Sequence, residues 1–118
     1  MAENAASRVR RICLALPETT EKQAWGEPTF RVGQRIFAML SSIDGATSVW
    51  CKSDDELRDA LIGSDPEHFF SPPYVGHKGW IGIRLDASAN WESVANLIEE
   101  SYLMIAERSR HRSGASRY

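Results

Sequence analysis

Apolar residues recur at helical spacing near both ends of the chain and at alternating spacing between them. The first helical set follows the i, i+3, i+4, i+7 pattern and consists of Val9, Ile12, Cys13 and Leu16. It predicts a helix over residues 4–16 that ends before Pro17. The second set runs from Trp91 to Ala106, behind Asn90 as a helix cap, and predicts a long final helix lying on a sheet.

The central stretch, residues 25–40, predicts a β-hairpin that turns at Gly33-Gln34. A two-residue turn that begins with glycine favours type II′ geometry, because that geometry needs a positive φ at its first position. The resulting register pairs Val32 with Arg35, Arg31 with Ile36, Phe30 with Phe37 and Thr29 with Ala38. One face then carries Phe30, Val32, Phe37 and Met39, and the other carries Arg31, Ile36, Ala38 and Leu40.

The remaining elements follow from turn and cap residues. A strand is expected from Lys22 to Trp25, interrupted by Gly26 and Pro28, and the Asp44-Gly45 pair predicts a turn before a strand over residues 47–52. The capping-box spacing of Ser53 and Glu56 predicts a short helix that ends near Gly63. An irregular loop over residues 64–79 leads into a strand over residues 80–86, whose less buried face carries Trp80, Gly82 and Arg84.

These elements predict an α+β fold of two layers, in which an antiparallel β-sheet packs against helices in the order α-β3-α-β2-α. A chain of 118 residues with 42% hydrophobic residues has room for one core, so we expect a single domain over residues 1–107. Beyond Arg108 the helical spacing is lost, and residues 108–118 are expected to form a basic disordered tail.

Composition narrows the classes of function. The sequence lacks an apolar run long enough for a bilayer, which predicts a cytoplasmic protein without a membrane partner. Cys13 and Cys51 lack the spacing of a metal or redox motif, so buried free thiols are expected. The net charge is −2 although the tail is rich in arginine, so the body is acidic and broad wrapping of duplex DNA is disfavoured.

Candidate chemistry is sparse. The acidic residues after Ser53 complement the start of a helix, so no metal site is predicted there, and no cofactor is predicted elsewhere. His68, His77 and Glu27 are the candidates for acid/base chemistry, but their spacing does not favour an enzyme. Trp80 and Arg84, with Gly82 between them, form either a stacking surface for a base or partner side chain, or a Trp with Arg84 packed on its ring.

Several short motifs occur in one order along the chain. They are LALPE at residues 14–18, WGEPTF at residues 25–30, IFA at residues 36–38, PPYVG at residues 72–76, GW at residues 79–80 and ESY at residues 100–102. With these motifs the sequence resembles the MmcQ/YjbR family of small bacterial proteins over roughly residues 8–106. The resemblance implies a two-layer α+β fold similar to type III secretion chaperones, a DNA-binding label and no catalytic residues.

Two hypotheses for function therefore remain open. One is a non-enzymatic DNA-binding protein that contacts phosphates through a few basic residues. The other is a protein- or peptide-binding module with a chaperone-like fold, as a monomer or weak homodimer. Both hypotheses use the same contact residues, which are Arg31, Arg35, Lys78, Trp80 and Arg84.

Overall fold

The computed structural model describes residues 4–42 and 46–115, and in this range the side chains of residues 77 and 108–115 are outside the description. The helices are α1 (Ala5–Leu14), α2 (Asp55–Ser64), the 3₁₀ turn η2 (Gly76–Lys78) and α3 (Trp91–Ala115). The strands are β1 (Thr19–Ala24), β2 (Glu27–Val32), β3 (Arg35–Ser41), β4 (Ser48–Lys52), β5 (Phe69–Phe70) and β6 (Trp80–Arg84). The turn predicted at Asp44-Gly45 lies outside the described residues.

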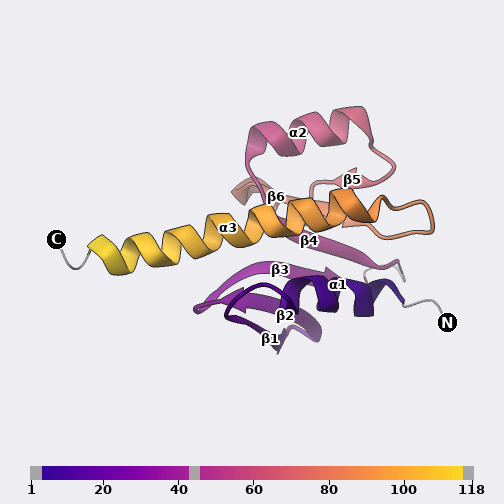
Figure 1. The fold of residues 1–118 in the computed structure, drawn as a ribbon. Coiled ribbons are helices and arrows are strands. Elements are labelled where there is room, and N and C mark those ends of the chain that lie inside the picture. The colour runs from indigo at the N-terminus through magenta and orange to yellow at the C-terminus, as the bar shows by residue number, and fades with distance from the viewer. Residues whose placement is uncertain (1–3, 43–45, 116–118) are drawn as a thin grey trace.

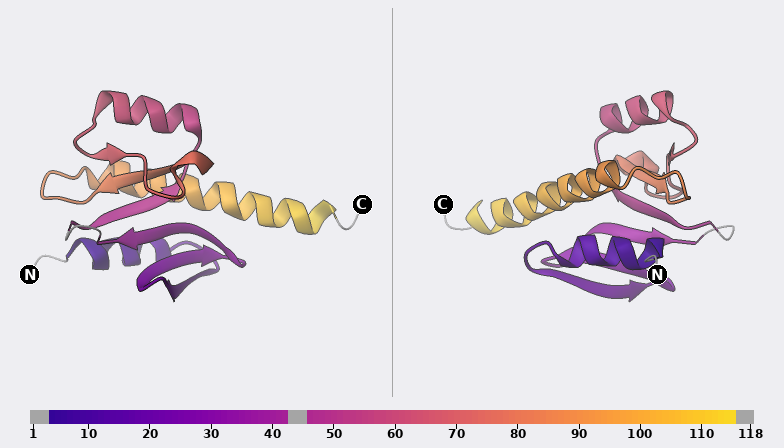
Figure 2. Two further views of the ribbon diagram at one scale, coloured as in Figure 1. Left: turned by 180° about the vertical axis from the view of Figure 1, so that it is seen from behind. Right: turned by 45° about the vertical axis from the view of Figure 1, so that its right-hand side comes forward.

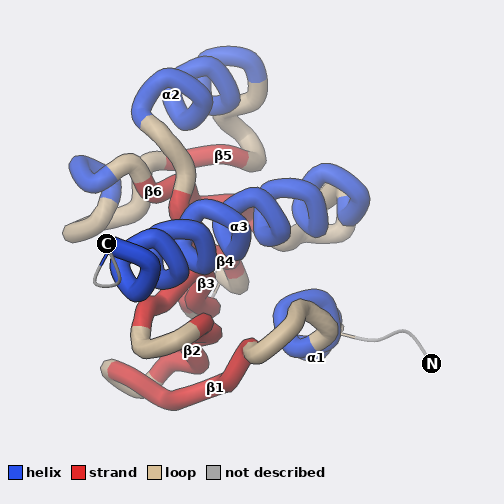
Figure 3. Tube along the Cα trace, turned by 60° about the vertical axis from the view of Figure 1, so that its left-hand side comes forward, coloured by secondary structure: helices blue, strands red, loops and turns tan. Residues whose placement is uncertain are grey.

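The strands form one antiparallel sheet in the order β1-β2-β3-β4-β6-β5 (Figure 1). Helix α3 crosses β3 and β4, α1 packs beside it over β1, and α2 lies against β5 and β6 at one edge (Figure 2). Figure 3 shows α1 and α3 on one side of the strands and the η2 segment on the other. The predicted α+β class is confirmed, although four strands precede α2 where the predicted order had three.

The core lies between the sheet and the two helices α1 and α3. Its members on the sheet include Phe30, Ala38, Val49, Cys51 and Ile81, all of them fully buried. The register places these residues on one face, because successive partners across the strands share a side of the sheet. Burial raises the pKa of the Cys51 thiol to about 11, and the prediction of buried free cysteines is confirmed.

The predicted hairpin register is right at its turn and wrong beyond it. Gly33 has the expected positive φ of 64°, and Val32 pairs with Arg35 and Arg31 with Ile36. A β-bulge then follows, and Phe30 pairs with Ala38 and Thr29 with Met39. The extra residue in β3 exchanges the faces predicted for Ala38, Leu40 and Met39, so that Ala38 and Leu40 join the core.

Phe37 is the residue that the bulge inserts, and it still reaches the core. Its ring meets the Tyr102 ring of α3 edge-on, with centroids 5.5 Å apart. Phe37 and Phe30 therefore both lie under the helical layer, as the sequence pattern predicted.

Two predicted helix boundaries are wrong. Asp54, and not Ser53, caps α2, because its carboxylate accepts a hydrogen bond from the Leu57 N–H at 2.7 Å. The Ser53 hydroxyl is instead buried without a hydrogen-bond partner among the described atoms. Helix α3 begins as predicted behind the Asn90 cap but runs on to Ala115, beyond the expected end near Arg108. Among the described residues, no helix combines the length and apolarity needed to cross a bilayer.

We expect Phe37→Ala to lower the free energy of unfolding by about 3–5 kcal/mol, because it leaves a cavity between β3 and α3. Urea denaturation followed by tryptophan fluorescence measures this loss. Leu103→Ala is the matched control, since Leu103 on α3 is 52% exposed and its truncation should change stability by less than about 0.5 kcal/mol. Equal effects of the two substitutions would contradict the placement of the core.

Candidate binding site

The face of the sheet opposite α1 and α3 concentrates positive charge. Following the register across the strands, the charged residues on this open face are Lys22, Glu27, Arg31, Lys52 and Arg84. Four of these five are cations, and Lys78 of η2 adds a further cation that lines a groove on this face. The helices carry much of the acidic charge, including Glu92, Glu99, Glu100 and Glu107 on α3. Helix α1 also carries Arg8, Arg10 and Arg11, so the helical side has charges of both signs while the open face is mainly cationic.

Trp25 projects from the tip of the β1–β2 hairpin at an unusual backbone conformation. Ala24 pairs with Glu27, so Trp25 and Gly26 form a two-residue turn, and their φ angles of 53° and 78° suit type I′ geometry. Asn or Asp normally occupies the first position of this turn, because other side chains are strained at positive φ. Trp25 is strained in this position, and 82% of its surface is exposed. Burial of the ring therefore does not compensate for the strain.

Tyr74 repeats the same combination in the loop between β5 and β6. Its φ is 70°, and the Val75 N–H donates to the Pro73 carbonyl at 2.8 Å across it, which makes Tyr74 the centre of a γ-turn. The form of this turn with positive φ is rare and strained. The Tyr74 side chain is 87% exposed. Two exposed aromatic residues in strained backbone therefore mark this side of the molecule as a candidate site.

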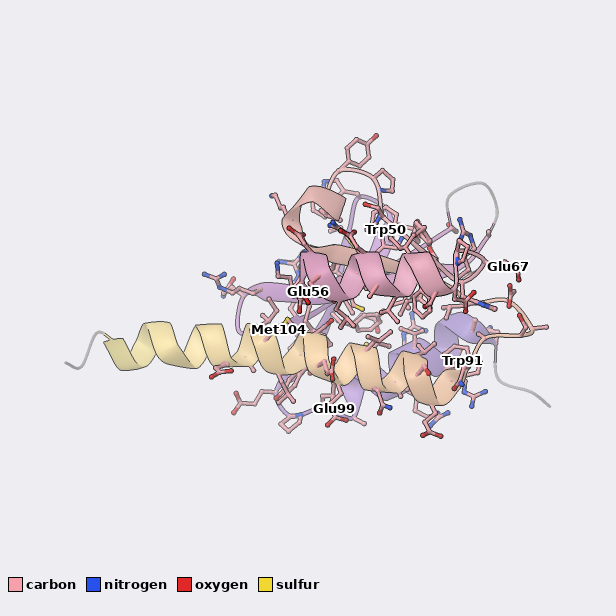
Figure 4. The ribbon with its side chains drawn as sticks, turned by 90° about the horizontal axis from the view of Figure 1, so that it is seen from above. Trp50, Glu56, Glu67, Trp91, Glu99 and Met104 are labelled. Carbon is pink, nitrogen blue, oxygen red and sulfur yellow. The ribbon has the colours of Figure 1, made fainter. Side chains whose placement is uncertain are left out.

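The two aromatic residues border one groove of about 710 Å³. Its walls come from three places along the chain, the β1–β2 turn, strands β3 and β4, and the loop before η2. The lining residues are Ala24, Trp25, Glu27, Met39, Leu40, Ser41, Trp50, Pro73, Tyr74, Val75 and Lys78. Figure 4 shows Trp50 on the side of the sheet away from Glu99 of α3. The lining is mostly apolar, with the Glu27 carboxylate and the Lys78 ammonium as its charged groups.

Cationic side chains hold the loop that carries Tyr74. The Arg58 guanidinium of α2 donates to the Gly76 carbonyl, and the Lys52 ammonium donates to the Lys78 carbonyl. The Ser53 N–H adds a hydrogen bond to the Gly79 carbonyl at 2.9 Å. A side chain at Gly76 would require the Ser71 hydroxyl to move, because an added Cβ would approach the Ser71 Oγ to 2.1 Å. The wall of the groove is thus fixed from both α2 and β4.

Of the five predicted contact residues, three lie toward one end of the sheet. Arg31 and Arg35 belong to the β2–β3 hairpin, and Lys78 lies in η2, next to β6. The Arg31 side chain does not simply project from the hairpin tip, because its Nε donates to the Thr29 Oγ1 at 3.1 Å on the open face. Lys78 is the one of the five that lines the groove.

Trp80 and Arg84 do not form the predicted surface around an open Gly82. The Phe70 ring of β5 covers Gly82, where an added Cβ would approach the ring to 2.3 Å. The Arg84 guanidinium packs over the Phe70 ring, 4.7 Å from its centroid. It also donates to the Pro66 and Glu67 carbonyls in the segment between α2 and β5. The expected stacking of Arg84 on Trp80 is therefore wrong, because Phe70 of β5, a strand that the sequence pattern did not predict, supplies the nearer ring.

His68 joins three elements on the far side of β6. Its Nδ1 lies 2.9 Å from Asp65 Oδ2, and its Nε2 lies 2.8 Å from the Ser88 Oγ. The hydrogen bond to Asp65, with Asp86 nearby, raises the pKa of His68. A small cavity of about 200 Å³ adjoins the cluster.

An Asp, a His and a Ser in a row resemble the triad of serine hydrolases, but the hydrogen bonds run differently. In a triad the serine hydroxyl donates to the imidazole. Here the Ser88 Oγ donates to Asp86 Oδ1 at 2.7 Å, so it accepts from His68 Nε2. His68 then donates from both nitrogens, as an imidazolium does, and the cluster acts as a clip between α2 and the segment before α3.

Sequence reasoning considered Glu27 only as an acid/base candidate and left Trp25 and Tyr74 out of the proposed contacts. The Trp-Gly pair flanked by strand residues was the available signal for a hairpin tip. For Tyr74, the two preceding prolines indicated a turn but gave no information about the direction of the ring.

Comparison with known proteins places this geometry in a family. The YjbR family model matches residues 14–104. No curated protein matches the chain. A Deinococcus radiodurans protein with a DUF419 domain superimposes with a TM-score of 0.79 at 22% identity, over 88% of this chain and 80% of that one. A Pseudomonas syringae protein gives a TM-score of 0.66 at 17% identity, over 87% of this chain and 99% of that one. At these identities the two structures establish a shared fold.

We expect Trp25→Asn to raise the free energy of unfolding by about 1 kcal/mol, because Asn-Gly is favoured in a type I′ turn. Trp25→Ala is the matched control, since it also removes the ring but keeps a residue that is strained at positive φ. Urea denaturation of the two variants separates relief of backbone strain from loss of the ring. A loss of stability in Trp25→Asn as large as in Trp25→Ala would show that the ring packs for stability.

His68 should stabilise the fold in a pH-dependent way. Because its folded pKa lies above the ordinary 6.5, the stabilisation is complete below about pH 6.5 and is lost as the pH rises through the folded value. The hydrogen bond from the Ser88 hydroxyl lowers the pKa of Asp86 below its ordinary value of 3.8. The stabilisation contributed by Asp86 is therefore fully present above about pH 3.8 and does not change between the two pH values compared below. The melting temperature of the natural protein should therefore exceed that of His68→Gln more at pH 5.5 than at pH 9. A difference that does not vary between these pH values would contradict the clip.

Proposed function

This chain belongs to the YjbR family, and we propose that it is a non-enzymatic protein that binds single-stranded nucleic acid on the open face of its sheet. The observation that carries the proposal is the groove bordered by Trp25 and Tyr74 on the cationic face. The buried free thiols of Cys13 and Cys51 suit a reducing compartment, which supports a cytoplasmic location.

The open face combines the two features that single strands require. Proteins that bind single strands use a positively charged surface that follows the backbone and aromatic side chains on which bases stack. Lys22, Arg31 and Lys78 would supply the charge, and Trp25 and Tyr74 would supply the rings. Lys22 and Lys78 are exposed, and Arg31 is half-buried against Thr29.

Duplex DNA suits this face less well. In a duplex the base faces are stacked on one another, so two exposed aromatic rings at the rims of a groove would find edges and phosphates only. The cations are also few for a duplex surface. Among the predicted contacts, Arg84 already donates to two backbone carbonyls, and Arg35 pairs with the buried Val32 on the helix-covered face. Arg31 and Lys78, together with Lys22, are therefore the side chains proposed to meet phosphates.

We expect a single-stranded DNA decamer to bind with a logarithmic salt dependence of about −2, because each phosphate contact on a single strand contributes about −0.7 and three are proposed. Replacing Lys22, Arg31 and Lys78 together by Gln should weaken binding at least tenfold at 50 mM salt and flatten the slope. Fluorescence anisotropy with a labelled decamer, from 50 to 200 mM NaCl, measures both quantities.

Arg8→Gln is the matched control for charge. Arg8 lies on α1 with its guanidinium 4.6 Å from the Trp91 ring, on the helical side of the molecule. Its loss should change the affinity for the decamer by less than about twofold. An equal effect of the control, or stronger binding of a duplex than of a single strand, would refute the proposal. Binding of peptides without any binding of oligonucleotides would instead favour the protein-binding hypothesis.

A further inference from the structure

We infer that the groove between Trp25 and Tyr74 selects a nucleobase that carries an exocyclic amine, with the Glu27 carboxylate as its acceptor. This inference rests on the proposed function and adds base preference to it. Phosphate contacts carry no sequence information, so any preference must come from groups that meet the base itself. In the groove the charged groups that can do so are Glu27 and Lys78.

The groove is built to hold a flat aromatic group at its rim. Trp25 and Tyr74 come from separate loops, and both line the same hollow. Trp50 of β4 also lines it, and its indole Nε1 donates to the Ser48 Oγ at 3.1 Å, so that donor is already satisfied. Trp25 and Tyr74 therefore offer exposed stacking surface, while the buried Trp50 belongs to the lining of the groove. A stacked base would have to be recognised by the polar groups at its edge.

Glu27 has free capacity to accept from such an edge. Its Oε2 accepts two hydrogen bonds from Ser42, one from the N–H at 2.7 Å and one from the Oγ at 3.1 Å. An ionised carboxylate has about four acceptor sites on its two oxygens, so about half of them remain for a ligand. The Ser42 hydrogen bonds also hold the carboxylate in one orientation, so binding of a base costs less side-chain entropy.

A held carboxylate separates the bases into two classes. Cytosine, adenine and guanine each carry an exocyclic amine that can donate to it, as cytosine N4 donates to Glu or Asp in known recognition. Thymine and uracil present carbonyl oxygens beside a single ring N–H, and a carbonyl facing a carboxylate is repelled. A good base contact discriminates by about 1–3 kcal/mol, which corresponds to at least about a fivefold difference in affinity.

The test compares labelled dC, dA and dT decamers at pH 7.5 and constant salt. The natural protein should bind dC and dA at least about fivefold more tightly than dT. Glu27→Gln keeps an amide oxygen for Ser42 but gains a donor, so it should bring the three affinities within about twofold without changing the salt slope. Trp25→Ala and Tyr74→Ala should weaken binding of all three decamers.

The outcomes distinguish this inference from the proposed function. If dT binds as tightly as dC and dA to the natural protein, the base preference is refuted and single-strand binding stands. If none of the decamers binds, the proposed function fails and the inference fails with it. A preference that survives in Glu27→Gln, with its fold verified by urea denaturation, would overturn the role of Glu27. The comparison of decamers on the natural protein tests the preference even if a variant fails to fold.

Discussion

Burial of one face of the sheet under α1 and α3 is the constraint on which the rest of the structure depends. Phe30, Ala38, Val49, Cys51 and Ile81 share that face, and in an antiparallel sheet their alternate neighbours must then lie on the other. No helix among the described residues covers the second face at β1, β2 and β3. That face can consequently carry charges and rings that a two-sided core would exclude, and the candidate site lies there.

The two exposed aromatic residues are better explained by function than by stability. A type I′ turn and a γ-turn with positive φ would both be less strained with Asn or Gly, and neither ring gains burial in return. Glu18, before β1, also has a positive φ of 59°, but Gly33 and Asn90 follow the local rules for a turn and a helix start. Departures from these rules at two rims of one groove suggest that strain was accepted to present the rings.

The sequence predicted much of the fold and little of the site, for physical reasons. Helical and strand spacing identified the layers, and the Gly33 turn fixed the register of the nearest pairs. The bulge places Phe37 in contact with Tyr102 of α3, and a contact between residues so far apart in sequence is not encoded by any local pattern. The groove likewise needs Trp25 and Tyr74 to meet from positions far apart in the chain. Only a three-dimensional arrangement could show that they share a hollow with Glu27.

An acidic protein can still attract phosphates if its carboxylates lie farther from the bound strand than the Debye length. The acidic residues of α3 lie a layer away from the open face, and layers pack about 10 Å apart. At physiological ionic strength the Debye length is about 8 Å, so these carboxylates are largely screened from a strand bound on the open face. Lys22, Arg31 and Lys78 would act at contact distance and be screened far less. Net charge is therefore a poor guide to binding here, and the sign of the charge on each face decides what that face can attract.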